Sequence, residues 1–285
     1  MELFKKIMRI TFWVLLVTGL GTVFAFVQKK ENETLCSKLN ISIQRDPMKE
    51  NYFVEEDDIR KLIAERFGQI ENAPLKSIDV NYLERLCYTN PWVSRADVYL
   101  TINGVVDIEI EQRQPILRII NQAQESFYMD SNGKLMLWSP NFTPRLLVAT
   151  GNISESYDEW NRTSIDELIN NDTLKTHTLL DDFYAMTRFI LADEFWSAHV
   201  EQIYINNYGE IELVPKVGDH KIIFGTSGQM EEKFWKLKTF YTEGLNYTGW
   251  ENYDTLNLKF ENQVVCTKKE KVGSKQLAVG KNSQH

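Results

Sequence analysis

One apolar run near the N-terminus constrains this chain more than any other feature. The run extends from Ile10 to Val27 and contains no charged residue. As a helix that rises about 1.5 Å per residue, it would cover roughly 27 Å, close to the thickness of the hydrocarbon core of a bilayer. Its apolar side chains are spread over all faces, which favours a membrane span over a buried helix of a soluble domain. We therefore predict a single transmembrane helix over residues 10–27.

The charges before the run predict its orientation. Lys5, Lys6 and Arg9 precede it, and basic residues are enriched at the cytoplasmic end of a span. We predict a cytoplasmic N-terminus over residues 1–9 and export of the chain that follows. A cleaved signal peptide is the alternative, but the run is longer than the usual apolar core of about 7–15 residues and lacks an A-x-A cleavage site.

The composition excludes several classes of function. Hydrophobic residues make up 43 % of the chain and charged residues 25 %, which is normal for a folded protein long enough to form one large domain or two. A net charge of -8 argues against nucleic acid as a partner. Cys36, Cys87 and Cys266 are too few and too far apart for a disulfide framework, and this usage fits a bacterial envelope.

After a polar spacer at residues 28–38, the chain has a compact pattern. Residues 39–45 alternate in polarity and predict a strand. Residues 55–67 have apolar positions at helical spacing, and the four acidic residues at the start suit a helix N-terminus better than a metal site. Residues 80–88 predict a second helix, with Asp79 as its N-cap.

Two further strands are predicted over residues 93–102 and 105–112. Asn103-Gly104 lies between them, and this pair favours a type I′ turn with positive φ at both residues. The second strand alternates between apolar and acidic residues, so its acidic face should meet solvent. The order is therefore β-α-α-β-β, with two helices packed on one face of a three-stranded sheet.

Residues 114–268 predict a second domain with a longer mixture of strands and helices. Residues 141–144 and 152–171 are polar and are expected to be irregular, and residues 269–285 are expected to be a disordered tail. Together with the first domain, this gives an α+β protein whose second domain is a β-rich mixed sheet with packed helices. Strands are predicted at 116–120, 126–129, 200–206, 210–215, 221–224, 255–260 and 263–267, and helices at 177–192 and 230–245.

The sequence has no recognisable catalytic or cofactor motif. It contains no nucleophile elbow, no H-E-x-x-H, no P-loop and no G-x-G-x-x-G. Its histidines have no ligand-like spacing, and Cys87 lies at an apolar helix position that suits a small core residue. We therefore predict no catalytic residue, no metal site and no cofactor. The histidines are His177, His199, His220 and His285.

A set of short motifs carries a family resemblance. They are Ile78-Asp79, Leu83-Glu84, Asn90-Pro91-Trp92-Val93, Ala96-Asp97-Val98, the run from Gln112 to Ile119, and the run from Phe127 to Leu135. In this order, and behind a single anchor, they resemble the FtsQ/DivIB family of bacterial division proteins over about residues 5 to 268. The resemblance implies a POTRA domain over residues 39–113 and a family β domain over 114–268. It also implies a non-catalytic divisome scaffold in the inner membrane at the septum, with a periplasmic C-terminus.

The residues at the junction between the two predicted domains suggest how the domains are joined. Arg113 and Pro115 end one strand and start another, and proline is tolerated at a strand start because it cannot donate in a ladder. We predict that Arg113 and Arg118 bridge the two domains through carboxylates or carbonyls. A partner site is the alternative reading of these residues.

The last two predicted strands leave an edge near the C-terminus, and an exposed edge can accept a strand from another chain. The resemblance implies that this region binds FtsB by strand addition, with FtsL alongside, and that Phe260 and Lys259 match an aromatic and a basic residue of that surface. Other divisome proteins would use the POTRA domain and the transmembrane segment. Leu258, Phe260 and Val264 could instead be core residues. The candidate partner-binding residues are Asn257, Leu258, Lys259, Phe260, Gln263, Val264, Val265 and Cys266, and Phe224, Phe234 and Trp235 are predicted to lie in the core beneath.

Two rival functions remain open from the sequence. A POTRA-bearing envelope chaperone or secretion component should carry repeated POTRA units and a barrel of amphipathic strands of about 10 residues. An anchored envelope hydrolase should carry a nucleophile, base or metal set. Neither rival accounts for Asn-Pro-Trp-Val and Gln-Arg-x-Pro together.

Overall fold

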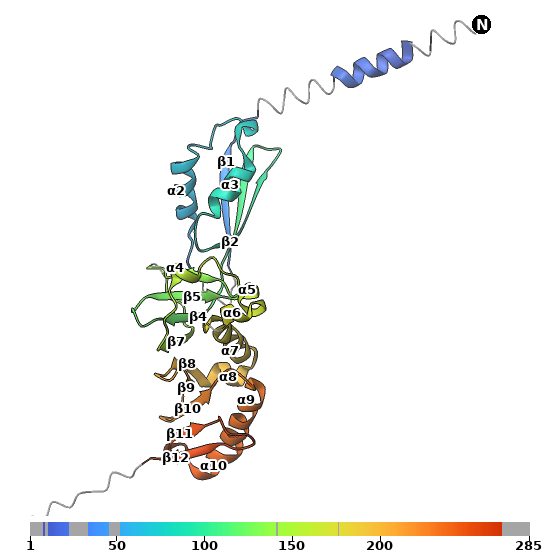
Figure 1. Ribbon diagram of the computed structural model, residues 1–285. Helices are drawn as coiled ribbons and strands as arrows, with labels where there is room; N and C mark the ends of the chain where they lie inside the picture. The colour runs from blue at the N-terminus through green and yellow to red at the C-terminus, as the bar shows by residue number, and fades with distance from the viewer. Residues whose placement is uncertain are drawn as a thin grey trace, which may run out of the picture. The chain divides into compact units, whose positions relative to one another are not determined.

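The computed structural model describes residues 8, 11–22, 34–45, 52–140, 142–175 and 177–269 (Figure 1). The chain divides into two compact units. Unit 1 ends at Gln114 and also takes in Ser139–Pro144, whereas unit 2 holds Pro115–Trp138 and the chain from Arg145 onward.

The apolar run is helical where it is described. Residues 11–22 form this helix, and both ends of the predicted span over 10–27 lie outside the described residues. Across the described ranges, no helix is both long enough and apolar enough to cross a membrane. The transmembrane helix therefore stays a prediction. The N-terminal residues 1–7, much of the spacer and nearly all of the predicted tail also lie outside the described residues.

Unit 1 has the predicted β-α-α-β-β order. The central strand of its sheet is β3, which pairs in parallel with β1 and antiparallel with β2. A short 3₁₀ turn, η1, precedes the second helix. The elements are β1 (Lys38–Gln44), α2 (Glu56–Arg66), η1 (Leu75–Ser77), α3 (Val80–Cys87), β2 (Val93–Leu100) and β3 (Val105–Gln112).

Alternating side chains of the sheet build the core of unit 1. Val106, Ile108 and Ile110 of β3 are fully buried, as predicted, while Glu109 and Glu111, on the opposite face of the strand, are exposed. Helix α2 packs on β1, α3 packs on β2, and the two helices contact each other. Burial of one face therefore fixes the register, since a slip by one residue would turn the acidic face inward.

The helix starts follow the predicted electrostatics. The Asp79 side chain accepts a hydrogen bond from the Tyr82 N–H at 3.0 Å, so it is the N-cap of α3. At the start of α2, the Glu55 N–H donates to Asp58 Oδ2 at 3.0 Å. These side chains satisfy or complement free N–H groups in the first turn.

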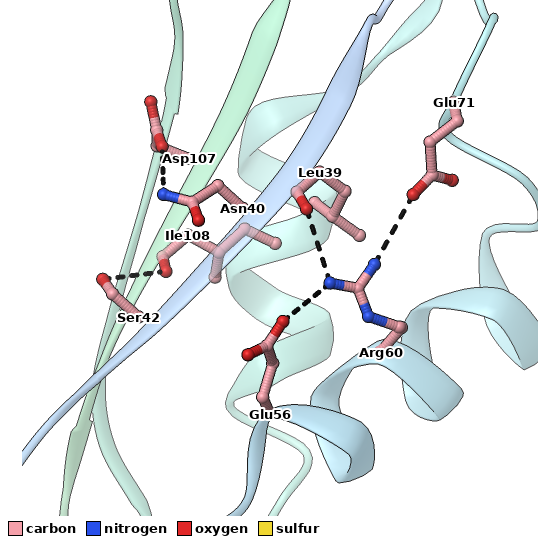
Figure 2. A network of polar contacts seen from close by, with 8 residues as sticks. All are labelled: Leu39, Asn40, Ser42, Glu56, Arg60, Glu71, Asp107 and Ile108. Carbon is pink, nitrogen blue, oxygen red and sulfur yellow. Dashed lines mark hydrogen bonds and ion pairs between the residues drawn. The ribbon is translucent and has the colours of Figure 1, made fainter.

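A polar network fastens α2 to the sheet (Figure 2). The Arg60 guanidinium donates to the Leu39 carbonyl at 3.4 Å, forms an ion pair with Glu56 at 2.7 Å, and reaches Glu71 at 3.5 Å. On the neighbouring strands, Asn40 Nδ2 donates to Asp107 Oδ1 at 2.8 Å. One arginine thus joins a helix, a strand and a loop.

The β2–β3 turn differs from the prediction. The type I′ assignment is wrong, because only Gly104 has a positive φ, at 82°, and Asn103 does not. The strands end at Leu100 and resume at Val105, and the Gly104 N–H donates to the Thr101 carbonyl at 3.0 Å. A longer loop with a left-handed glycine after the turn replaces the two-residue turn.

Unit 1 is discontinuous in sequence. Ser139–Pro144 belongs to it, although this segment follows residues of unit 2. The Phe142 ring lies edge-on to Phe53, with centroids 5.1 Å apart, and to Tyr52, with centroids 5.7 Å apart. The segment that was expected to be irregular therefore supplies an aromatic side chain to this unit.

Unit 2 is built on a nine-stranded mixed sheet. The strand order is β12-β11-β10-β9-β8-β7-β4-β5-β6. The pairs β4/β7, β7/β8 and β10/β11 are parallel, and the others are antiparallel. The strands are β4 (Pro115–Ile120), β5 (Ser126–Asp130), β6 (Leu135–Leu137), β7 (Leu147–Gly151), β8 (Val200–Ile205), β9 (Ile211–Pro215), β10 (Lys221–Gly225), β11 (Tyr253–Asn257) and β12 (Val265–Lys268).

Helices line one side of this sheet (Figure 1). The longest is α7, and Phe183, Met186 and Ile190 on its inner face are buried in the core of unit 2. The helices are α4 (Tyr157–Trp160), α5 (Ile165–Asn170), α6 (Asp172–Lys175), α7 (Leu180–Ala192), α8 (Glu194–His199), α9 (Met230–Thr239), the π-helical segment η2 (Phe240–Gly244), α10 (Leu245–Thr248) and η3 (Trp250–Asn252).

Several local predictions for unit 2 are wrong. Residues 152–171 are not irregular: they contain α4 and α5, which bury Ile165 and Leu168 in the core. Strands β6 and β7 and helix α8 were not predicted.

Candidate partner-binding edge of the nine-stranded sheet

Strand β12 forms one end of the sheet in unit 2. It pairs antiparallel with β11, with Leu256 opposite Cys266 and Asn257 opposite Val265. No other strand in the described part of the chain pairs with β12. One row of its backbone N–H and C=O groups therefore faces away from the sheet, and such a row can accept an added strand.

The predicted edge residues divide into a core set and an exposed set. Leu258 is fully buried, and its N–H donates to the Ile223 carbonyl at 2.9 Å, so the core reading is correct for this residue. Phe260 is 46 % exposed and Val265 is 41 % exposed. Gln263 is exposed too, while Val264 is half-buried against the core. The edge thus presents Phe260 and Val265 as apolar side chains.

The strands are shorter than the sequence suggested. We predicted strands over 255–260 and 263–267, but β11 ends at Asn257 and β12 begins at Val265. The turn between them includes Asn262 at a φ of 55°. Asn257 Oδ1 accepts a hydrogen bond from the Lys259 N–H at 3.0 Å, which draws the chain out of the strand direction. We call residues 258–264 the edge connection.

Lys259 extends away from β12 toward the β8–β9 turn. Its Nζ lies 2.8 Å from Glu210 Oε1, and the hydrogen bond from Lys259 lowers the pKa of Glu210. The aliphatic part of Lys259 passes over Gly225, where an added Cβ would come within 2.8 Å of Lys259 Cγ. Glycine at this position of β10 therefore makes room for the lysine.

A buried lysine holds the edge connection in place. Lys236 of α9 is only 7 % exposed, and its Nζ donates to the carbonyls of Leu258, at 3.2 Å, and Phe260, at 2.7 Å. Glu232 lies 3.5 Å from the same ammonium group. A cation so placed satisfies two carbonyls of the edge connection, and it fixes the chain just before β12.

A second buried lysine lies one turn earlier on the same helix. Lys233 donates to the Thr226 carbonyl at 2.8 Å, and its ammonium lies 5.0 Å from the centroid of the Phe224 ring. Burial lowers the pKa of Lys233. Sequence reasoning missed both lysines, because lysine in an amphipathic helix normally indicates the solvent face.

The aromatic residues near the edge were predicted with one error. Phe224 and Phe234 are buried in the core, as expected. Trp235 is 66 % exposed, so its predicted core position is wrong. The inward face of α9 is taken by Lys233, Phe234, Lys236 and Leu237, which leaves position 235 on the outer face.

The predicted junction residues make contacts within their own units. Arg113 donates from its N–H to the Trp92 carbonyl at 2.9 Å and from Nη1 to the Pro91 carbonyl at 3.4 Å. Arg118 Nε donates to Ser126 Oγ at 2.9 Å, and Pro115 is the first residue of β4. Bridging of the two domains by Arg113 and Arg118 stays a prediction.

Gln112, in the same motif, has a structural role that sequence reasoning missed. It is 1 % exposed, and its Oε1 accepts a hydrogen bond from the Val54 N–H at 2.9 Å. A polar residue at a buried position of an alternating strand was the available signal, because such a side chain needs a fixed partner. Gln112 therefore connects the segment before α2 to strand β3 through this hydrogen bond.

The placement of the described side chains bears on metal binding and on thiol reactivity. Among the described residues, no group of three or more His, Cys, Asp or Glu side chains is placed to hold a metal ion. Cys87 is buried in the core of unit 1, where burial and the neighbouring Glu84 raise the pKa of its thiol to about 11. Burial also raises the pKa of Cys266 in β12. Both thiols are thus poor nucleophiles at neutral pH.

Comparison with known protein families agrees with this architecture. Residues 34–111 match a POTRA-like domain, and residues 114–267 match the family described as FtsQ/DivIB, C-terminal related. A comparison with curated proteins gave no match. The second family match covers more than half of the chain and takes in every strand of the nine-stranded sheet except the last residue of β12. The chain therefore belongs to the FtsQ/DivIB family of cell-division proteins.

Proposed function

We propose that this protein is a non-catalytic scaffold of the bacterial divisome that captures FtsB, with FtsL alongside, by strand addition to β12. The observation that carries the proposal is the place of β12 at the end of the sheet, with no further strand paired to it among the described residues. An added strand would bond to backbone groups of β12, while side chains of the edge would select the partner.

The geometry around β12 suits such a partner. Phe260 and Val265 offer exposed apolar surface beside the free backbone row. The Lys236 bonds to the Leu258 and Phe260 carbonyls hold the edge connection in one conformation before binding. A preformed edge loses less conformational entropy on association than a mobile one, which favours affinity.

The location of the scaffold is part of the proposal. The uncharged run over residues 10–27, with basic residues before it, would act as a single-pass inner-membrane anchor with the N-terminus in the cytoplasm. Both units would then lie in the periplasm at the division septum. Unit 1 and the anchor would contact other divisome proteins, and together these contacts would gather the septal peptidoglycan synthesis machinery.

A binding measurement on the full chain in detergent tests the proposal. The ligands are the purified periplasmic parts of FtsB and FtsL from the same organism. In the edge variant, Phe260 and Val265 are both replaced by lysine. We expect at least tenfold weaker binding, because two charges would meet the apolar surface of the added strand. The matched control is Tyr208→Lys, which changes a 90 % exposed aromatic in the β8–β9 turn.

The outcomes separate the alternatives. Loss of binding in the edge variant alone, with an unchanged near-ultraviolet circular dichroism spectrum, supports β12 as the site. Full binding by the edge variant would move the site elsewhere, first to unit 1. If the unmodified chain binds neither ligand, the assignment of FtsB and FtsL as partners is wrong, and the envelope chaperone and hydrolase readings return.

A further inference from the structure

The turn between β2 and β3 places an isoleucine in full contact with solvent. Ile102 is 98 % exposed, at a turn position where glycine, asparagine, aspartate, serine and proline are the usual residues. Since the side chain packs on nothing within unit 1, the fold gives no reason for its size or its apolar character. An exposed apolar residue at the tip of a hairpin is therefore available for contact with another surface.

Three segments meet at this end of unit 1. The Ser37 N–H donates to the Gly104 carbonyl at 2.7 Å, which joins the start of the domain to the hairpin turn. Leu35 pairs with Pro74, which joins it to the loop before α3. Figure 1 shows the β2–β3 turn and the start of β1 at the same end of the unit. We call residues 34–38, 73–77 and 99–105 the hairpin-tip surface.

The hairpin-tip surface is apolar and basic. Leu35 is 50 % exposed and Leu100 is 39 % exposed, in addition to Ile102. The only charged residues of the three segments are Lys38 and Lys76, both exposed, although the whole chain has 40 acidic and 32 basic residues. Exposed aliphatic side chains with lysines in the same segments suit the interface of a bilayer that contains anionic lipids.

The chain enters unit 1 at this same surface. The apolar run ends at Val27, and residues 28–33 separate it from Thr34. Even fully extended, this stretch spans at most about 25 Å. If the run lies in the membrane, Thr34, the first residue of the hairpin-tip surface, is held within that distance of the bilayer. A short tether raises the effective concentration of lipid at the tip, so a weak contact is sufficient.

We infer that the hairpin-tip surface, led by Ile102, inserts into the interface of the membrane that anchors the chain. The inference rests on the anchor in the proposed function, and it adds a second point of contact with lipid. Two contacts close together would restrict how far unit 1 can swing about its tether.

Nitroxide accessibility in lipid nanodiscs tests the inference on the full chain. The discs contain phosphatidylethanolamine and phosphatidylglycerol, and the label is attached to one introduced cysteine at a time. The parent variant for all three sites carries Cys266→Ser and retains Cys36 and Cys87, which are 1 % and 0 % exposed. The amount of label that this parent variant takes up without an introduced cysteine is subtracted as the blank. The three sites are Ile102→Cys, Leu15→Cys in the apolar run, and Tyr88→Cys.

Tyr88 is the matched control within unit 1. It is 50 % exposed and lies shortly before the start of β2, whereas Ile102 follows the end of that strand, so the two are separated by about the length of β2. We expect labels at 102 and 15 to be relaxed strongly by oxygen and weakly by a water-soluble nickel chelate. The label at 88 should show the reverse.

The two proposals fail differently. A water-like label at 102 together with a lipid-like label at 15 overturns the inference and leaves the anchor intact. Water-like labels at both positions overturn the anchor and, with it, this inference. Lipid-like labels at all three positions would also overturn it, because the contact would not be specific to the tip.

Discussion

At the scale of single residues, His220 is the buried titratable group with the clearest consequence. It is 2 % exposed, and its Nε2 lies 2.7 Å from the hydroxyl of Tyr241, the second residue of the π-helical segment η2. Its Nδ1 makes no hydrogen bond within the described residues. Burial lowers the pKa of His220 from its ordinary value of 6.5; Lys269 adds to the effect, and Asp219 opposes it.

This lowered pKa predicts a loss of stability in mild acid. Below pH 6.5 the unfolded chain takes up a proton at His220 that the folded chain does not, so the free energy of unfolding falls as the pH falls. The slope from this residue is at most about 1.4 kcal/mol per pH unit. His220→Gln should flatten the dependence of the urea midpoint on pH between 7.5 and 5.5.

His177→Gln is the control for this experiment, because His177 is exposed. It should keep the pH dependence of the unmodified chain. An unchanged slope in His220→Gln would show that other groups cause the acid sensitivity.

At the scale of helices and strands, a strand can be predicted from the sequence when it is long and only one of its faces is buried. Strand β3 runs for eight residues with one face buried, and its alternation predicted both the strand and its orientation. Strand β6 was not predicted, because its three residues are too few to show an alternating pattern. A strand this short needs tertiary context before it can be recognised.

The position of the candidate site in the chain could be predicted from the sequence, but the roles of individual residues around it could not. Alternating residues near the C-terminus indicated a strand at the edge, and β12 lies there. The roles of Lys236 and Trp235 could not be predicted, because they depend on which face of α9 meets the carbonyls of Leu258 and Phe260. The helical periodicity of a sequence does not show which carbonyl groups elsewhere in the fold will accept hydrogen bonds from a buried lysine.

A glycine in β7 gives a test of strand pairing. Gly151 has a φ of 105°, and an added Cβ would lie 2.1 Å from the Ile205 carbonyl oxygen of β8. Gly151→Ala should therefore disturb the β7–β8 pair and lower the free energy of unfolding by a few kcal/mol, more than the roughly 1–2 kcal/mol of left-handed strain alone. Urea unfolding measures the difference.

Gly209→Ala is the comparison for that variant. Gly209 also has a positive φ, of 75°, but an added Cβ would meet nothing within 4 Å. This substitution should show only the strain component. Equal losses in the two variants would mean that the close approach between β7 and β8 contributes nothing.

At the scale of the whole molecule, the boundary between the units is not a single point in the chain. The family matches divide near residue 112, yet Ser139–Pro144 belongs to unit 1. The sequence did not reveal this, because a short polar segment between strands has no pattern that identifies its packing partner. Only the contacts of Phe142 with Tyr52 and Phe53 assign it.

The discontinuity predicts that a substitution outside the POTRA-like match weakens unit 1. Phe142→Ala removes two edge-on aromatic contacts from a half-buried ring and should cost unit 1 roughly 1–2 kcal/mol. Hydrogen exchange followed by mass spectrometry should show faster exchange in α2 and β3. Thr143→Ala, at the exposed neighbouring position, should leave exchange unchanged, and faster exchange confined to unit 2 in Phe142→Ala would contradict the assignment.

The place of β12 at the end of the sheet also has a consequence for the order of events during synthesis. β12 follows every other described strand in the chain, and its neighbour β11 ends only eight residues earlier. A chain interrupted before residue 265 would leave β11 as the last strand, with a different register and different side chains. Capture through β12 would therefore recruit only copies whose translation has passed residue 268, because a copy truncated earlier would lack the complete strand that the partner binds.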